Sequence, residues 1–187
     1  MNFSLSKLKI DFYFLGVLAI IIGVVIYKWS HLFLPYFWDE AWVYAPAIQA
    51  MAENGPSLLP DAIPVDLSRG HPLVFHFLGG LWMKIFGNSL FAGHLFPLAI
   101  SVATLIVVYH VGKSLAHPLV GLLAALIFAV QPVFLAQSAL ILPEMLMALW
   151  GLLVIYTFVK EKYWWFYRSD SNSIKGKAHR GNHRIIH

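Results

Sequence analysis

Residues 72–86 read PLVFHFLGGLWMKIF, and the way this stretch meets a membrane decides the topology of the whole chain. The stretch is shorter than the roughly 17–25 apolar residues that a transmembrane helix needs. His76, Gly80 and Lys84 recur every four positions along one helical face. This pattern is typical of a helix that lies in the membrane interface with its apolar side toward lipid. We therefore predict a flat, interfacial helix at 72–86.

The composition is that of a membrane protein. Of the 187 residues, 59% are hydrophobic and 12% are charged, whereas a soluble domain carries roughly 25% charged residues. The sequence contains no cysteine, which excludes disulfides, thiolate metal sites and thiol nucleophiles. It also lacks the motifs of phosphate-binding loops, dinucleotide folds, zincins and hydrolase nucleophile elbows. The chemistry must therefore come from other polar residues.

Four other apolar stretches are candidates to cross the membrane. The first, at about 12–34, follows Lys7 and Lys9 and lacks a small-residue cleavage site, so it predicts an uncleaved signal anchor. The others lie at about 94–112, 118–136 and 144–160 and have sufficient length. Gln131–Pro132 predicts a kink near the outer end of the third.

The distribution of charge favours four spans with both termini in the cytoplasm. With 72–86 flat, most basic residues lie inside, as the positive-inside rule predicts, namely Lys7, Lys9, Lys113, Lys160, Lys162, Arg168, Lys175, Lys177, Arg180 and Arg184. Most acidic residues lie outside, namely Asp39, Glu40, Glu53, Asp61, Asp66 and Glu144. The first outer loop then runs over 35–93, and the basic tail at 166–187 is aperiodic and predicted to be disordered. With the basic residues on one membrane side, no nucleic-acid partner is expected.

The segment FWDEAWVYAP at 37–46 places Asp39 and Glu40 side by side at the outer face. Both could simply begin a helix, with Asp39 as N-cap and Glu40 in the first turn. An interfacial carboxylate, however, costs desolvation unless it has a partner or a task. A catalytic role is therefore the alternative interpretation.

Glu144 follows Pro143 at the outer end of the fourth predicted span, on the same face as Asp39 and Glu40. It too could be an ordinary first-turn acid behind a helix-starting proline. Two separated acidic points at one interface could instead bind a cation, position a hydroxyl or divide catalytic roles. Among the basic residues, Arg69, His71 and Lys84 either contact lipid headgroups or form a phosphate clamp for a lipid-linked substrate.

The order of three short motifs is distinctive. DEAWVYAPAIQAM follows the first span, GHPLVFHFLGGLWMKIFG precedes the next two, and LPEMLMALWGLL begins the last. Over residues 1 to about 160 this order resembles GT-C type membrane glycosyltransferases, in particular the dolichyl-phosphate-mannose protein mannosyltransferases and the lipid A aminoarabinose transferases. The resemblance implies an all-α integral membrane fold of four transmembrane helices plus two juxtamembrane interfacial helices in the first outer loop. It also implies that 1–165 forms the N-terminal module of such an enzyme.

The resemblance also implies roles for individual residues. Asp39 takes the place of the family's catalytic aspartate, with Glu40 beside it. His71-Pro72-Leu73 matches the start of a second juxtamembrane helix with one proline missing, and Glu144 stands where an aspartate is common. Arg69, His71 and Lys84 would bind the donor phosphate, and Glu144 would orient the acceptor or help to hold a divalent cation.

We therefore expect transfer of a sugar from a polyprenyl-phosphate donor to a hydroxyl on a lipid, glycan or protein, with Asp39 as general base. The expected location is a bacterial inner membrane with its lipids. A non-catalytic four-span assembly partner, whose acids only cap helices, is the alternative. A transporter fits less well, because the spans carry almost no ionisable residues.

Overall fold

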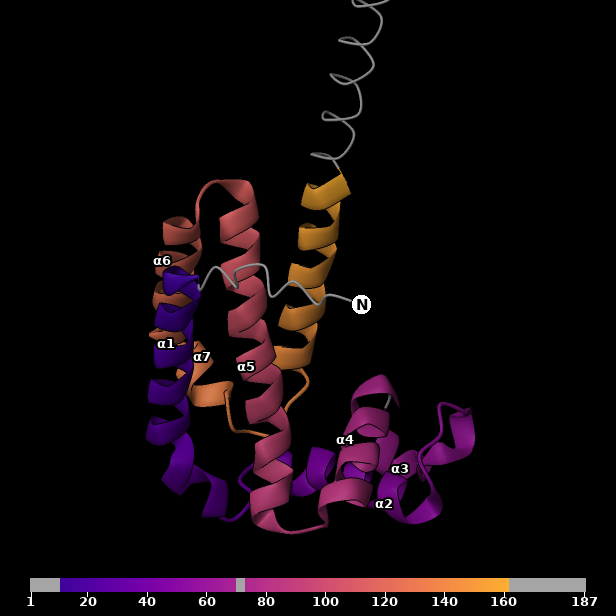
Figure 1. Ribbon diagram of the computed structural model, residues 1–187. Coiled ribbons are helices and arrows are strands. Elements are labelled where there is room, and N and C mark those ends of the chain that lie inside the picture. Colours follow the sequence, from indigo (N-terminus) through magenta and orange to yellow (C-terminus); the bar gives the residue numbers. More distant parts are fainter. Residues whose placement is uncertain (1–10, 70–72, 162–187) are drawn as a thin grey trace, which may run out of the picture.

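The computed structural model describes residues 11–69 and 73–161, and within these ranges the chain forms helices and no strands (Figure 1). His71 and the tail predicted to be disordered at 166–187 lie outside the described residues. Helix α1 covers Phe12–Lys28 and continues as a 3-10 helix, η1, over Trp29–Phe33. Helix α5 covers Leu90–Leu115 and runs in the opposite direction to α1.

The single helix predicted for 118–136 is interrupted. Helix α6 covers Pro118–Ala129, and a separate short helix, α7, covers Pro132–Gln137. Gln131 between them is extended, with φ −63° and ψ 130°, because the ring of a following proline disfavours the helical conformation in the residue before it. The 12 residues of α6 span about 18 Å. This length is below the roughly 30 Å of a bilayer's hydrocarbon core.

The other predicted spans are helical over nearly the expected residues. Helix 144–161 runs antiparallel to α6 and beside α5 (Figure 1). By length and composition, two helices of the described chain could cross a membrane, Phe12–Phe33 and Leu90–Leu115. The second is longer than the predicted 94–112 because Ser89 caps it, with its hydroxyl accepting the Ala92 N–H at 3.2 Å. The four-span arrangement stays a prediction.

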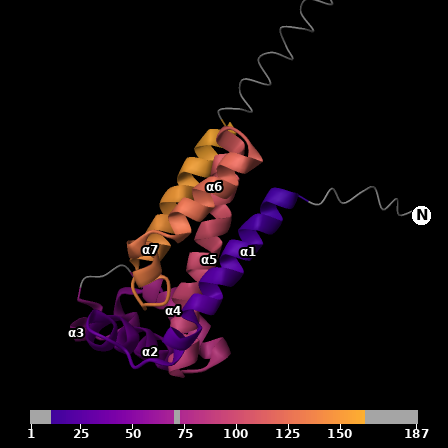
Figure 2. The same ribbon diagram turned by 90° about the vertical axis from the view of Figure 1, so that its left-hand side faces the viewer.

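The first loop folds into short helices that gather at one end of the bundle, as two perpendicular views show (Figures 1 and 2). The first of these is a π-helix, η2, at Glu40–Tyr44. It is followed by α2 at Ala45–Asn54, η3 at Pro60–Ala62, α3 at Val65–Ser68 and α4 at Leu73–Phe86. Helix α4 has the bounds expected for the interfacial helix. Its orientation to a bilayer stays a prediction.

The interfacial pattern implies that the face of α4 with His76 and Gly80 is open to water. In the structure this part of the face is covered. Both residues are buried, and α2 packs against this side. A Cβ added at Gly79 would lie 2.6 Å from Cδ1 of Ile48, and one at Gly80 would lie 2.7 Å from Cγ of Met51. The two glycines therefore allow α2 to approach closely, which a sequence period cannot reveal.

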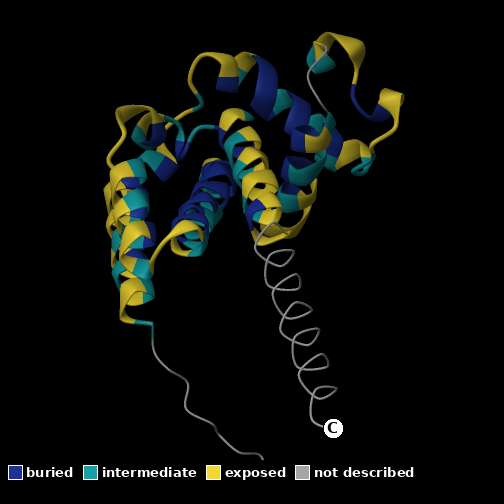
Figure 3. Cartoon of the chain, turned by 90° about the horizontal axis from the view of Figure 1, so that it is seen from above, coloured by how far each residue is buried: buried dark blue, intermediate teal, exposed yellow. Residues whose placement is uncertain are grey.

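The outer faces of the bundle are apolar and exposed (Figure 3). They include Leu15, Ile22 and Ile26 on α1, and Met147, Val154 and Phe158 on the helix at 144–161. Helix α5, in contrast, has buried residues along its whole length, from Ala92 to Gly112. An apolar exterior around a packed central helix suits a lipid environment.

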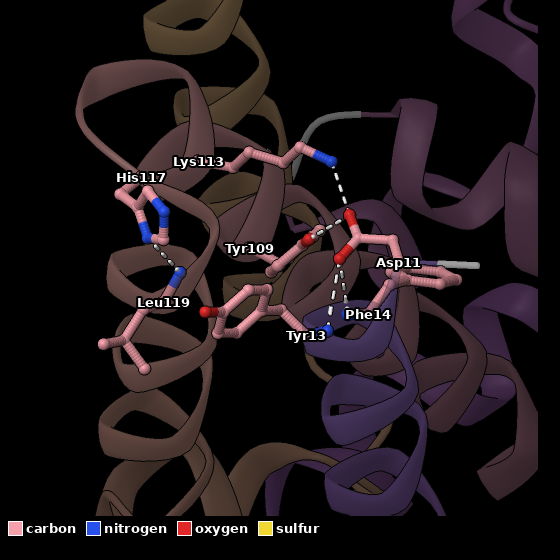
Figure 4. Close-up of polar contacts among 7 residues, drawn as sticks. All are labelled: Asp11, Tyr13, Phe14, Tyr109, Lys113, His117 and Leu119. Carbon is pink, nitrogen blue, oxygen red and sulfur yellow. Dashed lines mark hydrogen bonds and ion pairs between the residues drawn. The ribbon is translucent and has the colours of Figure 1, made fainter. Parts of the chain in front are cut away.

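A polar cluster closes the end of the bundle opposite α2 and α4 (Figure 4). Asp11 Oδ1 accepts the backbone N–H groups of Tyr13 and Phe14 at 3.2 and 3.3 Å, which caps α1. Asp11 Oδ2 accepts the Tyr109 hydroxyl at 2.6 Å and the Lys113 ammonium at 2.5 Å. These hydrogen bonds, that of Lys113 first, lower the pKa of Asp11 to about 2. We call this cluster of Asp11, Tyr109 and Lys113 the Asp11 end.

Candidate functional site

The turn that carries Asp39 has a strained backbone. Trp38 has φ 49°, in the left-handed region that bulky residues rarely adopt. Asp39 follows it with an exposed side chain and precedes the π-helix η2. π-Helical turns are rare and occur often at functional sites. Asp39 is thus an accessible carboxylate on a turn that the surrounding structure must hold in place.

Glu40, next in the chain, is almost completely buried, with 2% of its surface exposed. Its carboxylate accepts three donors. Oε1 accepts the Ile141 N–H at 2.8 Å and lies 3.0 Å from Nε2 of His94, and Oε2 accepts the Phe37 N–H at 3.2 Å. The Glu40 N–H in turn donates to the Phe37 carbonyl at 3.1 Å, which completes a local capping arrangement.

His94 lies in the first turns of α5 and is 2% exposed. Its Nδ1 lies 3.3 Å from the carbonyl oxygen of Leu32, which can only accept, so Nδ1 carries a hydrogen. Nε2 on the other side of the ring faces the Glu40 carboxylate at 3.0 Å, so both ring nitrogens of this buried histidine have a hydrogen-bond partner. We call the cluster of Glu40, His94 and Ile141 the Glu40 end.

Tyr36 packs against this pair. Its ring meets the His94 ring edge-on, with centroids 5.2 Å apart. Its hydroxyl lies over Gly93, where a methyl group would overlap the oxygen and would also lie 3.2 Å from Cδ1 of Ile141. Burial, and secondarily the charge of Glu40, raises the pKa of Tyr36. Gly93 is thus required for the close approach of the first loop to α5.

Glu144 and Asp39 both act electrostatically on Tyr44. Both carboxylates are exposed. Burial raises the pKa of Tyr44, and the charges of Glu144 and Asp39 raise it further. The Tyr44 ring also stacks on His76 and meets Phe75 edge-on, at centroid distances of 6.0 and 5.8 Å. The charges of both acids that the sequence predicts on one membrane face therefore act on the same tyrosine.

Two hollows adjoin these acids. One, of about 170 Å³, is lined by Phe37, Trp38, Asp39, Glu40, Leu140 and Leu142. The other, of about 350 Å³, is an apolar groove between α4 and helix 144–161, lined by Val74, Phe75, Pro143, Leu146, Met147 and Trp150. Leu142 and Pro143, one in each lining, are neighbours in the chain. The loop that precedes Glu144 thus contributes to the lining of both hollows.

The predicted cation group is not gathered at one place in the described residues. Arg69 is exposed, has φ 43°, and its Nε donates to the Asp66 carbonyl at 3.4 Å. Lys84 is exposed in the last turn of α4, about 16 Å along the helix axis from Leu73 at its start. Leu73 and Lys84 therefore lie toward opposite ends of α4.

The partners of Glu40 are not evident from the sequence, although an ionisable side chain at a span end, as His94 is, can itself be a signal of a specific partner. The N–H groups of Phe37 and Ile141 leave no trace in a sequence. For a metal, the described ranges contain no group of three or more His, Asp or Glu residues that could hold an ion.

Comparison with known families gives one match. The family model described as dolichyl-phosphate-mannose-protein mannosyltransferase matches residues 70–168. The matched residues include α4, α5, α6 and α7 together with His94, Lys84 and Glu144, and they exclude Asp39 and Glu40. No curated protein and no solved structure matches the chain.

Proposed function

Since the chain belongs to the dolichyl-phosphate-mannose-protein mannosyltransferase family, and is thereby a membrane glycosyltransferase of the GT-C type, we propose that it transfers a sugar from a polyprenyl-phosphate donor to an acceptor hydroxyl. Asp39 is the general base of this proposal. The reaction takes place on the outer face of the membrane, with both termini in the cytoplasm.

The observation that carries the proposal is the placement of Asp39. It is an exposed carboxylate that lines a hollow of about 170 Å³. It shares the surroundings of Tyr44 with a second exposed acid, Glu144. A general base must reach the proton that it removes, and it must do so from a defined position. Among the acids at this end of the bundle, Asp39 combines both properties, since Glu40 is buried and occupied.

The chemistry follows from these roles. The acceptor oxygen attacks the anomeric carbon as Asp39 takes the hydroxyl proton, and the bond from that carbon to the phosphate oxygen breaks. The polyprenyl phosphate leaves with the electron pair, and the anomeric configuration inverts. Glu144 would orient the acceptor hydroxyl. In this proposal Glu144 could also help to hold a divalent cation, but no step depends on one.

The apolar groove supports a lipid-linked donor. Its lining is entirely hydrophobic side chains and a proline from α4 and from the helix at 144–161. Such a surface suits an isoprenoid chain, which gains free energy by leaving water and makes no hydrogen bonds. Because the groove adjoins the loop before Glu144, a chain lying in it would bring its phosphate toward the acids. Arg69 and His71 are the proposed phosphate ligands, and Lys84, at the far end of α4, is better placed for lipid headgroups.

The test is Asp39→Asn in the full gene product in membranes, with dolichyl-phosphate-mannose and its undecaprenyl analogue as donors. Loss of a general base lowers rates by roughly 10²- to 10⁴-fold. We expect such a loss in kcat with little change in donor KM. Glu53→Gln is the matched control, because Glu53 is an exposed acid of the same loop.

Near wild-type transfer by Asp39→Asn, at equal expression, would remove Asp39 from the mechanism. No transfer by the wild type from either donor would contradict the donor class. It would favour the alternative of a non-catalytic assembly partner, whose acids only stabilise helices.

A further inference from the structure

We propose that Glu40 and His94 form a buried positioning pair that fixes the direction of the Asp39 carboxylate, with Glu40 itself taking no proton from the acceptor. This inference rests on the proposed role of Asp39 as base. It gives a function to His94, a residue far along the chain from Asp39. It also assigns different roles to the two neighbouring acids. Asp39 would do the chemistry, and Glu40 would act through it.

Glu40 is unsuited to be the base. Three donors already occupy its two oxygens, those of Ile141, His94 and Phe37. Its carboxylate is also 2% exposed. An incoming hydroxyl would have to displace one of these donors and leave a buried polar group without a partner, which is costly.

The pair holds together three segments that are distant in the sequence. Glu40 stands at the beginning of η2, His94 belongs to α5, and Ile141 lies in the loop between α7 and the helix at 144–161. Nδ1 of His94 extends the connection to the carbonyl of Leu32 at the end of the first predicted span. The same carboxylate thus fixes the turn with Asp39 to α5 and to the loop that leads to Glu144.

The turn needs such an anchor because its backbone is strained. Trp38, directly before Asp39, has φ 49°. A bulky residue keeps this conformation only when surrounding contacts enforce it. The Phe37 N–H and the Glu40 carboxylate bracket Trp38 and Asp39 with a hydrogen bond of 3.2 Å. Release of Glu40 would let the turn relax and move Asp39, although Asp39 would remain chemically intact.

The kinetic consequence is specific. A displaced base affects the chemical step more than donor binding, so kcat falls while KM for the donor changes little. Displacement by about 1 Å can lower a rate by roughly 100-fold. Glu40→Gln keeps the size of the side chain but places an amide N–H where the carboxylate accepts. An amide nitrogen at the Oε2 position removes the acceptor of the Phe37 N–H, and one at the Oε1 position removes that of the Ile141 N–H and changes the contact with His94.

The first experiment measures transfer from dolichyl-phosphate-mannose, or from its undecaprenyl analogue, by Glu40→Gln and His94→Gln in the full gene product in membranes. We expect kcat to fall roughly 10- to 100-fold in Glu40→Gln, and by a smaller factor in His94→Gln, with donor KM within about threefold of wild type. Glu53→Gln is again the control and should retain wild-type kcat.

The double variant Asp39→Asn/Glu40→Gln shows whether Glu40 acts through Asp39. If it does, residues acting as one unit give non-additive losses, and the double variant should be within about threefold of Asp39→Asn. A double variant whose loss is the product of the two single losses would overturn the inference. Failure of the proposed function gives a different result, because Asp39→Asn alone would then remain active.

The second experiment does not depend on activity. Hydrogen–deuterium exchange of the chain in lipid nanodiscs reports on the peptides that contain Phe37 and Ile141, whose N–H groups Glu40 accepts. We expect at least one of these two amides, the one that loses its acceptor, to exchange at least roughly tenfold faster in Glu40→Gln, in line with the loss of a closed hydrogen bond. The peptide with Tyr13 and Phe14, at the Asp11 end, should be unchanged and reports an intact fold. Unchanged protection at Phe37 and Ile141 would overturn the inference.

Discussion

The two ends of the bundle use the same chemical device in different surroundings. At the Asp11 end a carboxylate accepts two backbone N–H groups and pairs with Lys113 of α5. At the Glu40 end a carboxylate also accepts two backbone N–H groups and pairs with His94 of α5. The side chains of the first pair are 28% and 40% exposed, and those of the second are 2% exposed.

This difference in exposure determines what each pair contributes. Water and salt screen an exposed pair, so its net contribution to stability is small even when its distances are short. A buried pair gains little over an apolar replacement of both partners, but removal of one partner leaves an uncompensated charge inside the protein. The Asp11 end therefore resembles a surface contact between α1 and α5. At the Glu40 end, by contrast, removal of either partner alone should destabilise the fold.

The largest stability effect is expected for His94→Leu. It leaves the buried carboxylate of Glu40 without its side-chain partner, and one-sided removal of a buried pair costs about 3–5 kcal/mol. Denaturant unfolding in detergent micelles, with helix content as the signal, measures the change. The double variant Glu40→Gln/His94→Leu should recover part of the loss because it removes the uncompensated charge. A double variant less stable than His94→Leu would contradict the idea that the cost at the Glu40 end comes from a buried carboxylate left without its partner.

Gly93→Ala should have an intermediate effect. The added methyl group overlaps the Tyr36 hydroxyl, and overpacking of this kind costs about 1–3 kcal/mol. Tyr36→Phe removes the hydroxyl and should restore much of the stability of Gly93→Ala. A thermal unfolding series of the wild type, both single variants and the double variant checks this. Additive losses would show that Tyr36 and Gly93 do not touch.

Asp11→Asn should have a smaller effect than either variant at the Glu40 end. Because the pair is exposed, the drop in Tm should shrink further when salt is raised to about 1 M, where the Debye length is about 3 Å. The His94→Leu deficit should be nearly independent of salt. Equal salt sensitivity of the two variants would contradict the contrast between the ends.

Acid should reveal the smallest effect. The pKa of Asp11 in the folded chain is lowered from 3.8 to about 2. A lowered folded-state pKa adds stability above the unfolded value, and this stability disappears as pH falls through the folded value. The Tm difference between the wild type and Asp11→Asn should therefore be constant above about pH 5 and should close between pH 3.8 and 2. A gap that persists at pH 2 would argue against the hydrogen bonds of Asp11.

The helices were largely predictable from local pattern, because apolar runs and their flanking residues are properties of short windows. The stretches at 12–34 and 144–160 are helical almost as expected. The end of α6 at Ala129 could not be predicted in this way, although Gln131–Pro132 indicates a kink. A kinked helix and two separate helices share the same local signal, and packing decides between them.

For the candidate site, the sequence could identify the acids but not their environments. Asp39 and Glu40 are adjacent and similar, yet one is exposed and the other is 2% exposed. That difference arises from Ile141, which is 101 residues beyond Glu40, and from His94 on another helix. Contacts at such separations follow from the tertiary fold. No period or motif in a single sequence encodes them.

Two of the three donors that hold Glu40 are main-chain groups, and this affects how related sequences can diverge. Any amino acid except proline supplies a backbone N–H at positions 37 and 141, so these hydrogen bonds survive most substitutions there. Correlated changes across an alignment would then connect Glu40 with His94 and leave position 141 unlinked. The contact between the first loop and the loop before Glu144 would be invisible to covariation, and a design that preserves it must constrain the backbone at Ile141 and exclude proline there.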